Sequence, residues 1–411
     1  MTTGSCSEAA AVAEVLGVDG PFSFPEKLFQ RLWARREFDP RDARTADGRR
    51  LKVVYPGRWN HLGGPDFRDA RLQLEGEALT GDIELHLRAQ DWAAHAHTND
   101  PAYYNVILHV VLFPPALAYT YGMGGRPIPI FALLPRLYHD LEEYAANAAI
   151  EFLANRPSAR LMEELGRRPL PELRGEFRRQ TEARWAQKVR FAGLRLAKFG
   201  WVEACHHAAL EILGYRFNRT PMLRLASRYP LVEWGSGKID VAGALESERE
   251  TWSLQGVRPA NQPRVRLRQY AAWAATVPDW PERLRAALAV TATDGLAGVG
   301  GADADTRAIR SKWDFPSLRE IFARDVCGGA VRGTRLDNLI CDGFLPLVAA
   351  DQADRAGGWG RLWQHWYPGD LPALIRPGLR DLGLVDGGPT PTSHGLAQGL
   401  LGWLLEQERQ A

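Results

Sequence analysis

A run of seven residues at positions 106–112, Val-Ile-Leu-His-Val-Val-Leu, is apolar apart from its middle residue, His109. Valine, isoleucine and leucine in one short run are typical of a strand that is buried on both faces. A strand of that kind needs a neighbour on each side. The run therefore predicts the central strand of a sheet whose other strands come from elsewhere in the chain.

Three earlier segments have the pattern of such strands. Residues 51–55 are rich in β-forming residues and end at a Pro-Gly pair, and residues 67–74 carry apolar side chains at alternate positions. Residues 80–88 alternate most regularly. Ile83, Leu85 and Leu87 fall on one face of this strand, whereas the opposite face receives the polar side chains of Asp82, Glu84, His86 and Arg88.

Two helical segments complete this part of the chain. Residues 25–33 have a proline suited to the first turn of a helix and apolar side chains at helical spacing, namely Leu28, Phe29, Leu32 and Trp33. Asp91 is placed to cap a short helical segment at residues 92–97. The predicted order is helix, three strands, helix and strand.

The chain changes character after residue 135, where stretches such as 137–153 and 176–213 are rich in Ala, Leu, Arg and Glu at helical spacing. We predict an α+β protein with a flexible N-terminus at 1–20, a mixed α/β domain at 21–135 and a mostly α-helical region at 136–411. Proline and glycine predict breaks at residues 216–221, 258–263 and 357–372, and a joint near 294–305.

The charge balance restricts the partners of the whole chain. Lys and Arg number 51 against 49 Asp and Glu, a net charge of +2, so contact with nucleic acid would depend on a local basic patch. The four cysteines are scattered, and residues 1–20 lack the basic start of a signal peptide. No apolar run approaches the roughly 18 residues of a membrane span. We expect a cytoplasmic protein without a membrane partner.

One local basic patch exists at residues 156–198, where twelve Lys or Arg stand against five Glu. On helices this excess of about +7 would suit a phosphate backbone, so DNA or RNA is the predicted partner. A solvated helix face explains the same charges without a partner.

Potential ligands gather between His61 and His109, which contain half of the ten histidines. Asp66 precedes one predicted strand, and Glu84 and His86 share a face of the next. Two carboxylates on one face can hold a hard divalent ion such as Mg²⁺ or Mn²⁺, which makes a bound water a better nucleophile. These residues predict a site for metal-dependent hydrolysis, with His86 orienting the water.

The spacing resembles the signature of the PD-(D/E)XK nuclease superfamily. Pro65-Asp66 is followed, after 17 further residues, by Glu84-Leu85-His86. The resemblance implies a core of helix, three strands, helix and strand, and Mg²⁺- or Mn²⁺-dependent cleavage of nucleic acid. It also implies that Asp66 and Glu84 hold the ion and that Glu26, from the first helix, completes the site. The superfamily usually has lysine where this chain has His86, whose ordinary pKa is near 6.5.

Over most of its length the chain is also similar to a bacterial family catalogued as domain of unknown function 2851. This similarity identifies relatives of the chain, but it implies no particular activity, because the family has none established. It rests on Tyr55-Pro56-Gly57, Asn60, Gly64-Pro65-Asp66-Phe67, Glu84-Leu85-His86, Asp91-Trp92, His95, His97, residues 104–111, residues 258–263 and Arg266.

The remaining histidines leave alternatives open. Two interpretations of His109 remain open: a histidine of the core whose ring nitrogens are hydrogen-bonded, or a further ligand of the metal site. His95 and His97 diverge on a helix and converge only on an extended segment. Together His86, His95, His97 and His109 would make a zinc site for a hydrolase. A different alternative for the whole protein is a nuclease fold that has lost its activity and acts as a nucleic-acid-binding or scaffold protein.

Overall fold

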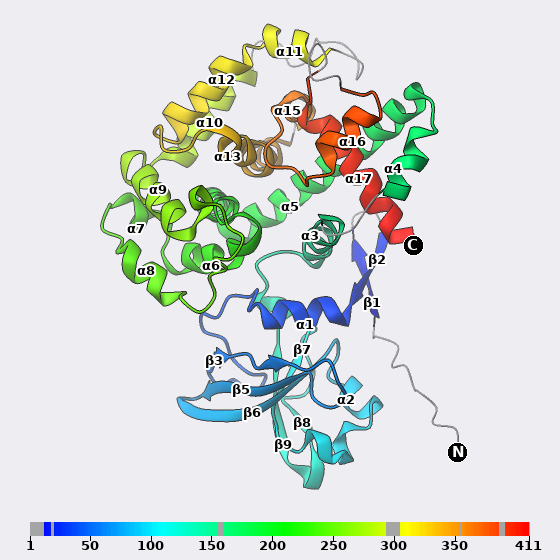
Figure 1. Cartoon of the computed structure of the whole chain (residues 1–411). Coiled ribbons are helices and arrows are strands. Elements are labelled where there is room, and N and C mark those ends of the chain that lie inside the picture. Colours follow the sequence, from blue (N-terminus) through cyan, green and yellow to red (C-terminus); the bar gives the residue numbers. More distant parts are fainter. Residues whose placement is uncertain are drawn as a thin grey trace. The chain divides into compact units, whose positions relative to one another are not determined.

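The computed structural model describes residues 12–17, 20–154, 159–292, 305–353, 356–385 and 391–410. It divides into two compact units, Met1–Ala145 and Ala146–Ala411. The first unit carries the sheet and the second is helical (Figure 1). The mixed α+β class and the helical second part of the chain match the prediction from sequence.

The first unit is built on a seven-stranded mixed sheet. Strands β3, β5 and β6 are antiparallel neighbours, β6, β7 and β9 are parallel neighbours, and β8 pairs antiparallel with β9 at one edge. Their bounds are β3 Leu51–Tyr55, β4 Arg58–Trp59, β5 Phe67–Leu74, β6 Glu77–His86, β7 Val106–Val111, β8 Tyr119–Tyr121 and β9 Pro127–Ala132. The apolar run 106–112 is a central strand, as predicted, because β7 lies between β6 and β9.

A hairpin precedes the sheet. Strands β1, Val12–Gly17, and β2, Gly20–Pro25, pair antiparallel in a segment whose first part was predicted to be flexible. Residues 1–11 and 18–19 lie outside the described part of the chain.

Helix α1, Glu26–Ala34, packs its apolar face against the unit's core. Its four apolar residues predicted from spacing are all buried, and Trp33 contacts the ring of Phe131 on β9. The indole Nε1 of Trp33 donates a hydrogen bond of 3.0 Å to the carbonyl of Pro56. These contacts fix α1 beside the loop that follows β3.

The helical connection between β6 and β7 is shorter than predicted. Helix α2 covers Asp91–Ala94 only, and 3₁₀ turns follow at His97–Asn99 and Pro101–Tyr103. The helix ends because Ala96 takes a left-handed conformation, with φ 60° and ψ 23°. Such a conformation costs a residue other than glycine roughly 1–2 kcal/mol.

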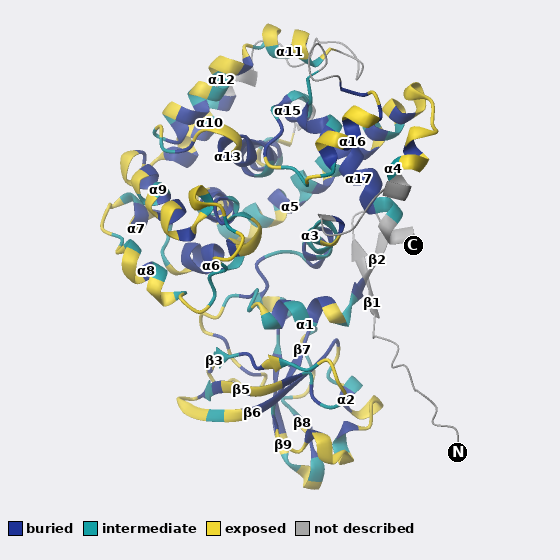
Figure 2. Ribbon diagram, in the orientation of Figure 1, coloured by how far each residue is buried: buried dark blue, intermediate teal, exposed yellow. Residues whose placement is uncertain are grey.

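Strand β6 is exposed at its start and buried on both faces from Gly81 to His86 (Figure 2). The polar face predicted for this strand is therefore not a solvent face. Asp82, Glu84 and His86 are 9%, 5% and 1% exposed, so their polar atoms need partners inside the protein.

The remaining helices form most of the second unit. The 44-residue α5 is kinked at Gly200, where φ is 72°, and it packs against α6, α14 and α17. The bounds are α3 Leu141–Ala154, α4 Ala159–Gly166, α5 Leu170–Leu213, α6 Tyr215–Arg228, α7 Leu231–Gly235, α8 Val241–Ser247, α9 Pro263–Thr276, α10 Trp280–Ala292, α11 Thr306–Lys312, α12 Phe315–Ile321, α13 Gly333–Asn338, α14 Leu345–Asp351, α15 Ala356–His365, α16 Ile375–Asp381 and α17 His394–Gln410.

Two of the predicted breaks are wrong in part. Helix α6 runs through residues 216–221 with Pro221 inside it, and within these residues the backbone departs from helical angles at Asn218, where φ is −121°. Helix α15 occupies residues that were predicted to be irregular. The joint near 294–305 falls almost wholly outside the described residues.

Two further findings concern the described residues. Cys205, Cys327 and Cys341 are buried free thiols. No helix among the described segments combines the length and apolar character needed to cross a membrane.

Candidate metal centre

The predicted ligands meet at one end of the sheet. Strands β5 and β6 are antiparallel, so the start of β5, just after Asp66, lies beside the end of β6. Strands β6 and β7 are parallel, so their ends also lie side by side. The register pairs Glu84 with His109. Sheet pairing thus brings together three segments that are separate in the sequence.

The loop before β5 is held by Asn60. Its main-chain N–H donates to the carbonyl of Asp66 at 2.7 Å, and its side-chain amide donates to the carbonyl of Pro65 at 2.9 Å. Gly64 has φ of +93°, a conformation that favours glycine. These features set the direction in which the chain enters β5 and so place the side chain of Asp66.

The carboxylates of Asp66 and Glu84 each accept a hydrogen bond from the main chain at or next to the other residue. The main-chain N–H of Asp66 donates to Oε2 of Glu84 at 3.0 Å, and the main-chain N–H of Leu85 donates to Oδ2 of Asp66 at 3.0 Å. The first two residues of the predicted site are therefore adjacent.

A residue that sequence reasoning missed supports Asp66 from α1. Gln30 Nε2 donates to Oδ1 of Asp66 at 2.7 Å. Glu26, the residue predicted to complete the site, is the first residue of the same helix, four positions before Gln30 and on the same helical face. That i, i+4 relation was the available signal for Gln30.

The third predicted residue, His86, is completely enclosed. Its Nδ1 lies 2.9 Å from Nε2 of His109, and Nδ1 of His109 lies 2.7 Å from Oγ1 of Thr120 on β8. His109 therefore joins the cluster, an alternative that the sequence left open. Thr120 carried no signal in the sequence, because its strand was not predicted.

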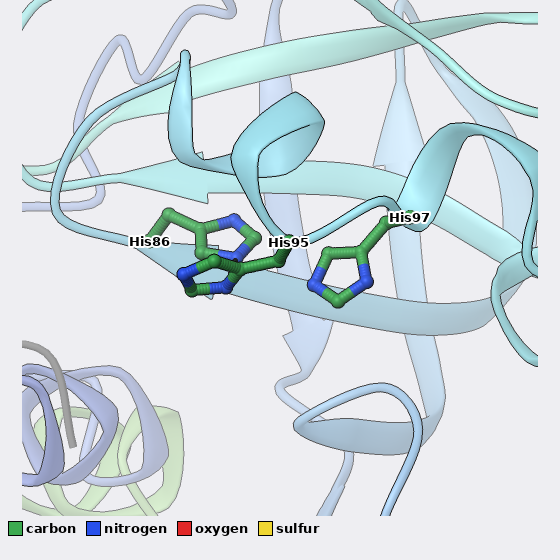
Figure 3. Close-up of side chains that lie close together, drawn as sticks. All are labelled: His86, His95 and His97. Carbon is green, nitrogen blue, oxygen red and sulfur yellow. Dashed lines mark hydrogen bonds between the residues drawn. The ribbon is translucent and has the colours of Figure 1, made fainter. Parts of the chain in front are cut away.

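Two more histidines approach from the connection after α2. Nε2 of His86 lies 3.1 Å from Nδ1 of His95, and Nε2 of His97 lies 3.4 Å from Oε1 of Glu84. His86, His95 and His97 each offer a ring nitrogen within 4.8 Å of the other two (Figure 3). His97 is held in place by stacking on Tyr103, with ring centroids 3.8 Å apart.

Burial keeps the inner histidines neutral. Desolvation, with contributions from the neighbouring imidazoles of His109, His97 and His95, lowers the pKa of His86 from 6.5 to about 2. Desolvation, with a contribution from His97, lowers the pKa of His109 to about 3. At neutral pH each ring therefore has one unprotonated nitrogen, and a histidine must be neutral in this way to bind a metal ion.

The donor set fits a metal ion. Imidazole nitrogens and a carboxylate oxygen converge from β6 and the connection after α2, and His95 leaves one side of the cluster exposed. A set with three imidazoles suits zinc and other transition metals better than Mg²⁺, which prefers oxygen ligands. In this arrangement the ion would lower the pKa of a bound water.

The basic segment 156–198 lies in α4 and α5 of the second unit, and Arg156 is outside the described residues. At least five of its twelve basic side chains form ion pairs, which reduces the charge available to a partner. The pairs are Arg167–Glu163, Arg168–Glu164, Arg179–Glu176, Lys188–Asp342 and Arg195–Glu211.

The first unit is thus a mixed α/β fold with a histidine and carboxylate cluster at one end of its sheet. Residues 26–242, which include every residue of the cluster, match the family described as Protein of unknown function (DUF2851). The chain belongs to this family. No curated protein and no solved structure matches it.

Proposed function

We propose that this protein is a divalent-metal-dependent phosphodiester hydrolase that acts on nucleic acid, with Asp66, Glu84 and His86 as its catalytic residues. The observation that carries the proposal is the pair of hydrogen bonds from the N–H groups of Asp66 and Leu85 to the carboxylates of Glu84 and Asp66. They hold two acids from neighbouring strands at fixed positions beside His86.

The resemblance to PD-(D/E)XK nucleases supports the same reaction. The order α1, β3, β5, β6, α2 and β7 agrees with the helix, three strands, helix and strand of that superfamily, apart from the two-residue β4. Asp66 and Glu84 stand at the matching positions, and Glu26 stands on the first helix.

Each residue has a distinct task in this proposal. Asp66 and Glu84 contribute carboxylate oxygens to the ion, with Glu26 as a further ligand and Mg²⁺ or Mn²⁺ as the ion expected from these acids. When bound, the ion activates a water molecule for attack on phosphorus. His86 is neutral because burial lowers its pKa to about 2, so it orients water by hydrogen bonding and does not supply the positive charge of a lysine.

Nucleic acid would contact the helical region through residues 156–198. The excess of basic residues there supports this part, although several of them pair with acids. A second candidate function is nucleic-acid binding without cleavage. It is favoured by the neutral His86 at the position where the resembling nucleases have lysine.

The test uses the full chain with labelled single- and double-stranded DNA and RNA in Mg²⁺, Mn²⁺ or Zn²⁺. Glu84→Gln and Asp66→Asn are expected to lower the cleavage rate by roughly 10²–10³-fold, since a metal ion supplies several kcal/mol of stabilisation in the transition state. Asp69→Asn is the matched control, because Asp69 is exposed and lies on β5, the strand that follows Asp66.

The outcomes separate the two functions. Cleavage that is lost in both site variants and kept in the control supports the hydrolase. Salt-dependent binding without cleavage in any metal supports the second function. A chain that neither binds nor cleaves nucleic acid contradicts both.

A further inference from the structure

We infer that the ion of this site is a transition metal of the zinc class, held by the imidazoles of His86, His95 and His97 together with Oε1 of Glu84. The inference deepens the proposed function, on which it rests only for the reaction that the ion serves, and it revises that function in two points: the ion is of the zinc class in place of Mg²⁺ or Mn²⁺, and His86 is a ligand in place of a residue that orients water. Binding of the ion can be tested without any assay of hydrolysis.

The distances between the donor atoms support a common centre. For zinc bonds of about 2.0–2.1 Å in tetrahedral geometry, two donor atoms lie roughly 3.3 Å apart. Nε2 of His86 is 3.1 Å from Nδ1 of His95 and 3.7 Å from Oε1 of Glu84. Oε1 of Glu84 is 3.4 Å from Nε2 of His97. These separations bracket the expected value.

The second ring nitrogen of His86 is arranged as in a metal ligand. A histidine that binds a metal usually donates its other N–H to a protein acceptor, which fixes the tautomer and the ring. Nδ1–H of His86 can donate to His109, whose Nδ1–H can donate in turn to Thr120. This direction leaves the lone pair of Nε2 facing His95 and Glu84. His109 and Thr120 are therefore positioning residues.

Local backbone strain provides an independent observation. His95 and His97 would diverge on a regular helix, and the left-handed Ala96 between them turns the chain so that both rings reach His86. Strain of this kind persists only where surrounding structure compensates for it, and it concentrates at ligand sites. A bound ion is such a compensation.

A hydrogen-bonded chain of histidines is the alternative without an ion. It accounts for the contacts of His86 with His95 and His109. In that alternative each ring nitrogen has a separate partner. An ion would instead be bound at one point by Nε2 of His86, by a ring nitrogen of each of the other two histidines and by Oε1 of Glu84, which the separations of 3.1, 3.4 and 3.7 Å allow.

The choice of metal follows from the ligands. Mg²⁺ keeps oxygen ligands and several waters, so three imidazoles disfavour it. Zinc, cobalt and other first-row transition ions accept imidazole readily. His95 is exposed, so the cluster reaches the protein surface at this residue.

The experiment measures the metal directly. The full chain is stripped with a chelator and titrated with Zn²⁺, Co²⁺ and Mg²⁺, and Co²⁺ is followed by its visible absorption. One Zn²⁺ or Co²⁺ per chain is expected, with a tetrahedral Co²⁺ spectrum and no competition from equimolar Mg²⁺. His95→Gln and His97→Gln should each weaken binding by roughly 100-fold or more, beyond the 10–100-fold effect of an outer contact.

His61→Gln is the matched control, because His61 is exposed and its ring contacts that of Trp59 outside the cluster. Its affinity should equal that of the wild type. His95 is also exposed, so its substitution tests the inference even if a buried variant does not fold. Unchanged affinity in His95→Gln and His97→Gln, or binding of Mg²⁺ in preference to Zn²⁺, would overturn the inference.

The results also separate this inference from the proposed function. Stoichiometric zinc binding that requires the three histidines, without cleavage of any nucleic acid, would support the inference and contradict the hydrolase. Cleavage in Mg²⁺ that persists in His95→Gln and His97→Gln would contradict the inference and support the hydrolase.

Discussion

Asp66 and Glu84 stabilise each other's position, because each carboxylate accepts a 3.0 Å hydrogen bond from the main chain at or beside the other residue. The acid pair is thus part of the sheet's hydrogen bonding as well as of the site. A substitution at either position should therefore affect both stability and hydrolysis, and the loss of stability should be smaller where the new side chain still accepts the main-chain hydrogen bond.

Glu84→Ala should lower the free energy of unfolding by about 1–3 kcal/mol, because it leaves the N–H of Asp66 without its acceptor. Glu84→Gln keeps an acceptor and should lose less than Glu84→Ala. Urea unfolding of both variants measures the difference. Glu77→Ala, at the exposed start of β6, is the control and should change stability by less than about 0.5 kcal/mol. Equal losses in all three variants would contradict the structural role of Glu84.

Gln30→Met should reduce hydrolysis without unfolding the protein. It removes the donor to Oδ1 of Asp66 and keeps the length of the side chain. A hydrogen bond to a charged group contributes about 1.5–3 kcal/mol, so the rate should fall by roughly 10–100-fold. Gln73→Met, on β5 and half-buried, is the control for the exchange itself. A rate that is unchanged in Gln30→Met would show that Asp66 does not need this support.

Thr120→Val should weaken both the fold and metal binding. Oγ1 of Thr120 is 2.7 Å from Nδ1 of His109, and valine would leave this buried nitrogen without a partner at a cost of about 1–3 kcal/mol. Loss of an outer contact of this kind lowers metal affinity by about 10–100-fold. Thermal unfolding and Co²⁺ titration measure the two effects. Thr80→Val, exposed on β6, should change neither quantity.

Gly81→Ala should destabilise the first unit although Gly81 has an ordinary backbone conformation. An added Cβ would lie 2.5 Å from Cγ2 of Ile107 and 2.6 Å from the carbonyl oxygen of Asn105. The main chain at the start of β7 cannot move freely, so a cost of about 1–3 kcal/mol is expected in urea unfolding. Gly63→Ala meets nothing within 4 Å and serves as the control. Equal stability of the two variants would contradict the tight approach of β6 and β7.

Stability of the second unit should fall as the pH is lowered from about 6.5 to about 4. His206 is fully buried beside Tyr270 and the carbonyl of Tyr229, and desolvation lowers its pKa from 6.5 to about 4. Between these values the unfolded chain binds the extra proton, so the free energy of unfolding rises with pH by up to about 1.4 kcal/mol per unit. The contribution is complete above pH 6.5 and lost as the pH falls towards 4.

Urea unfolding at several pH values tests this expectation. His206→Gln does not titrate, so its slope between pH 4 and 6.5 should be smaller than that of the wild type by up to one proton. His365 and His394 also have lowered pKa values, near 4 and 3, and retain part of the slope. An identical slope in His206→Gln would contradict burial of a neutral His206.

Local sequence patterns predicted the strands β3, β5, β6 and β7, the helix α1 and the helical nature of the second unit. These features follow from local periodicity, since alternation places Glu84 and His86 on one face and an apolar run predicts burial on two faces. Asp66 and Glu84 were found for the same reason, because each is defined by its position relative to a strand.

The other residues of the cluster reach these two acids through contacts between distant segments of the chain. Alternation within β7 does not determine its register, so the inclusion of His109 depended on its pairing with Glu84 across two parallel strands. Gln30 reaches Asp66 because α1 packs on the unit's core, and His95 and His97 converge because Ala96 leaves the helical conformation. Contacts between distant segments and strained turns are selected by the energy of the whole fold, which a local pattern does not contain.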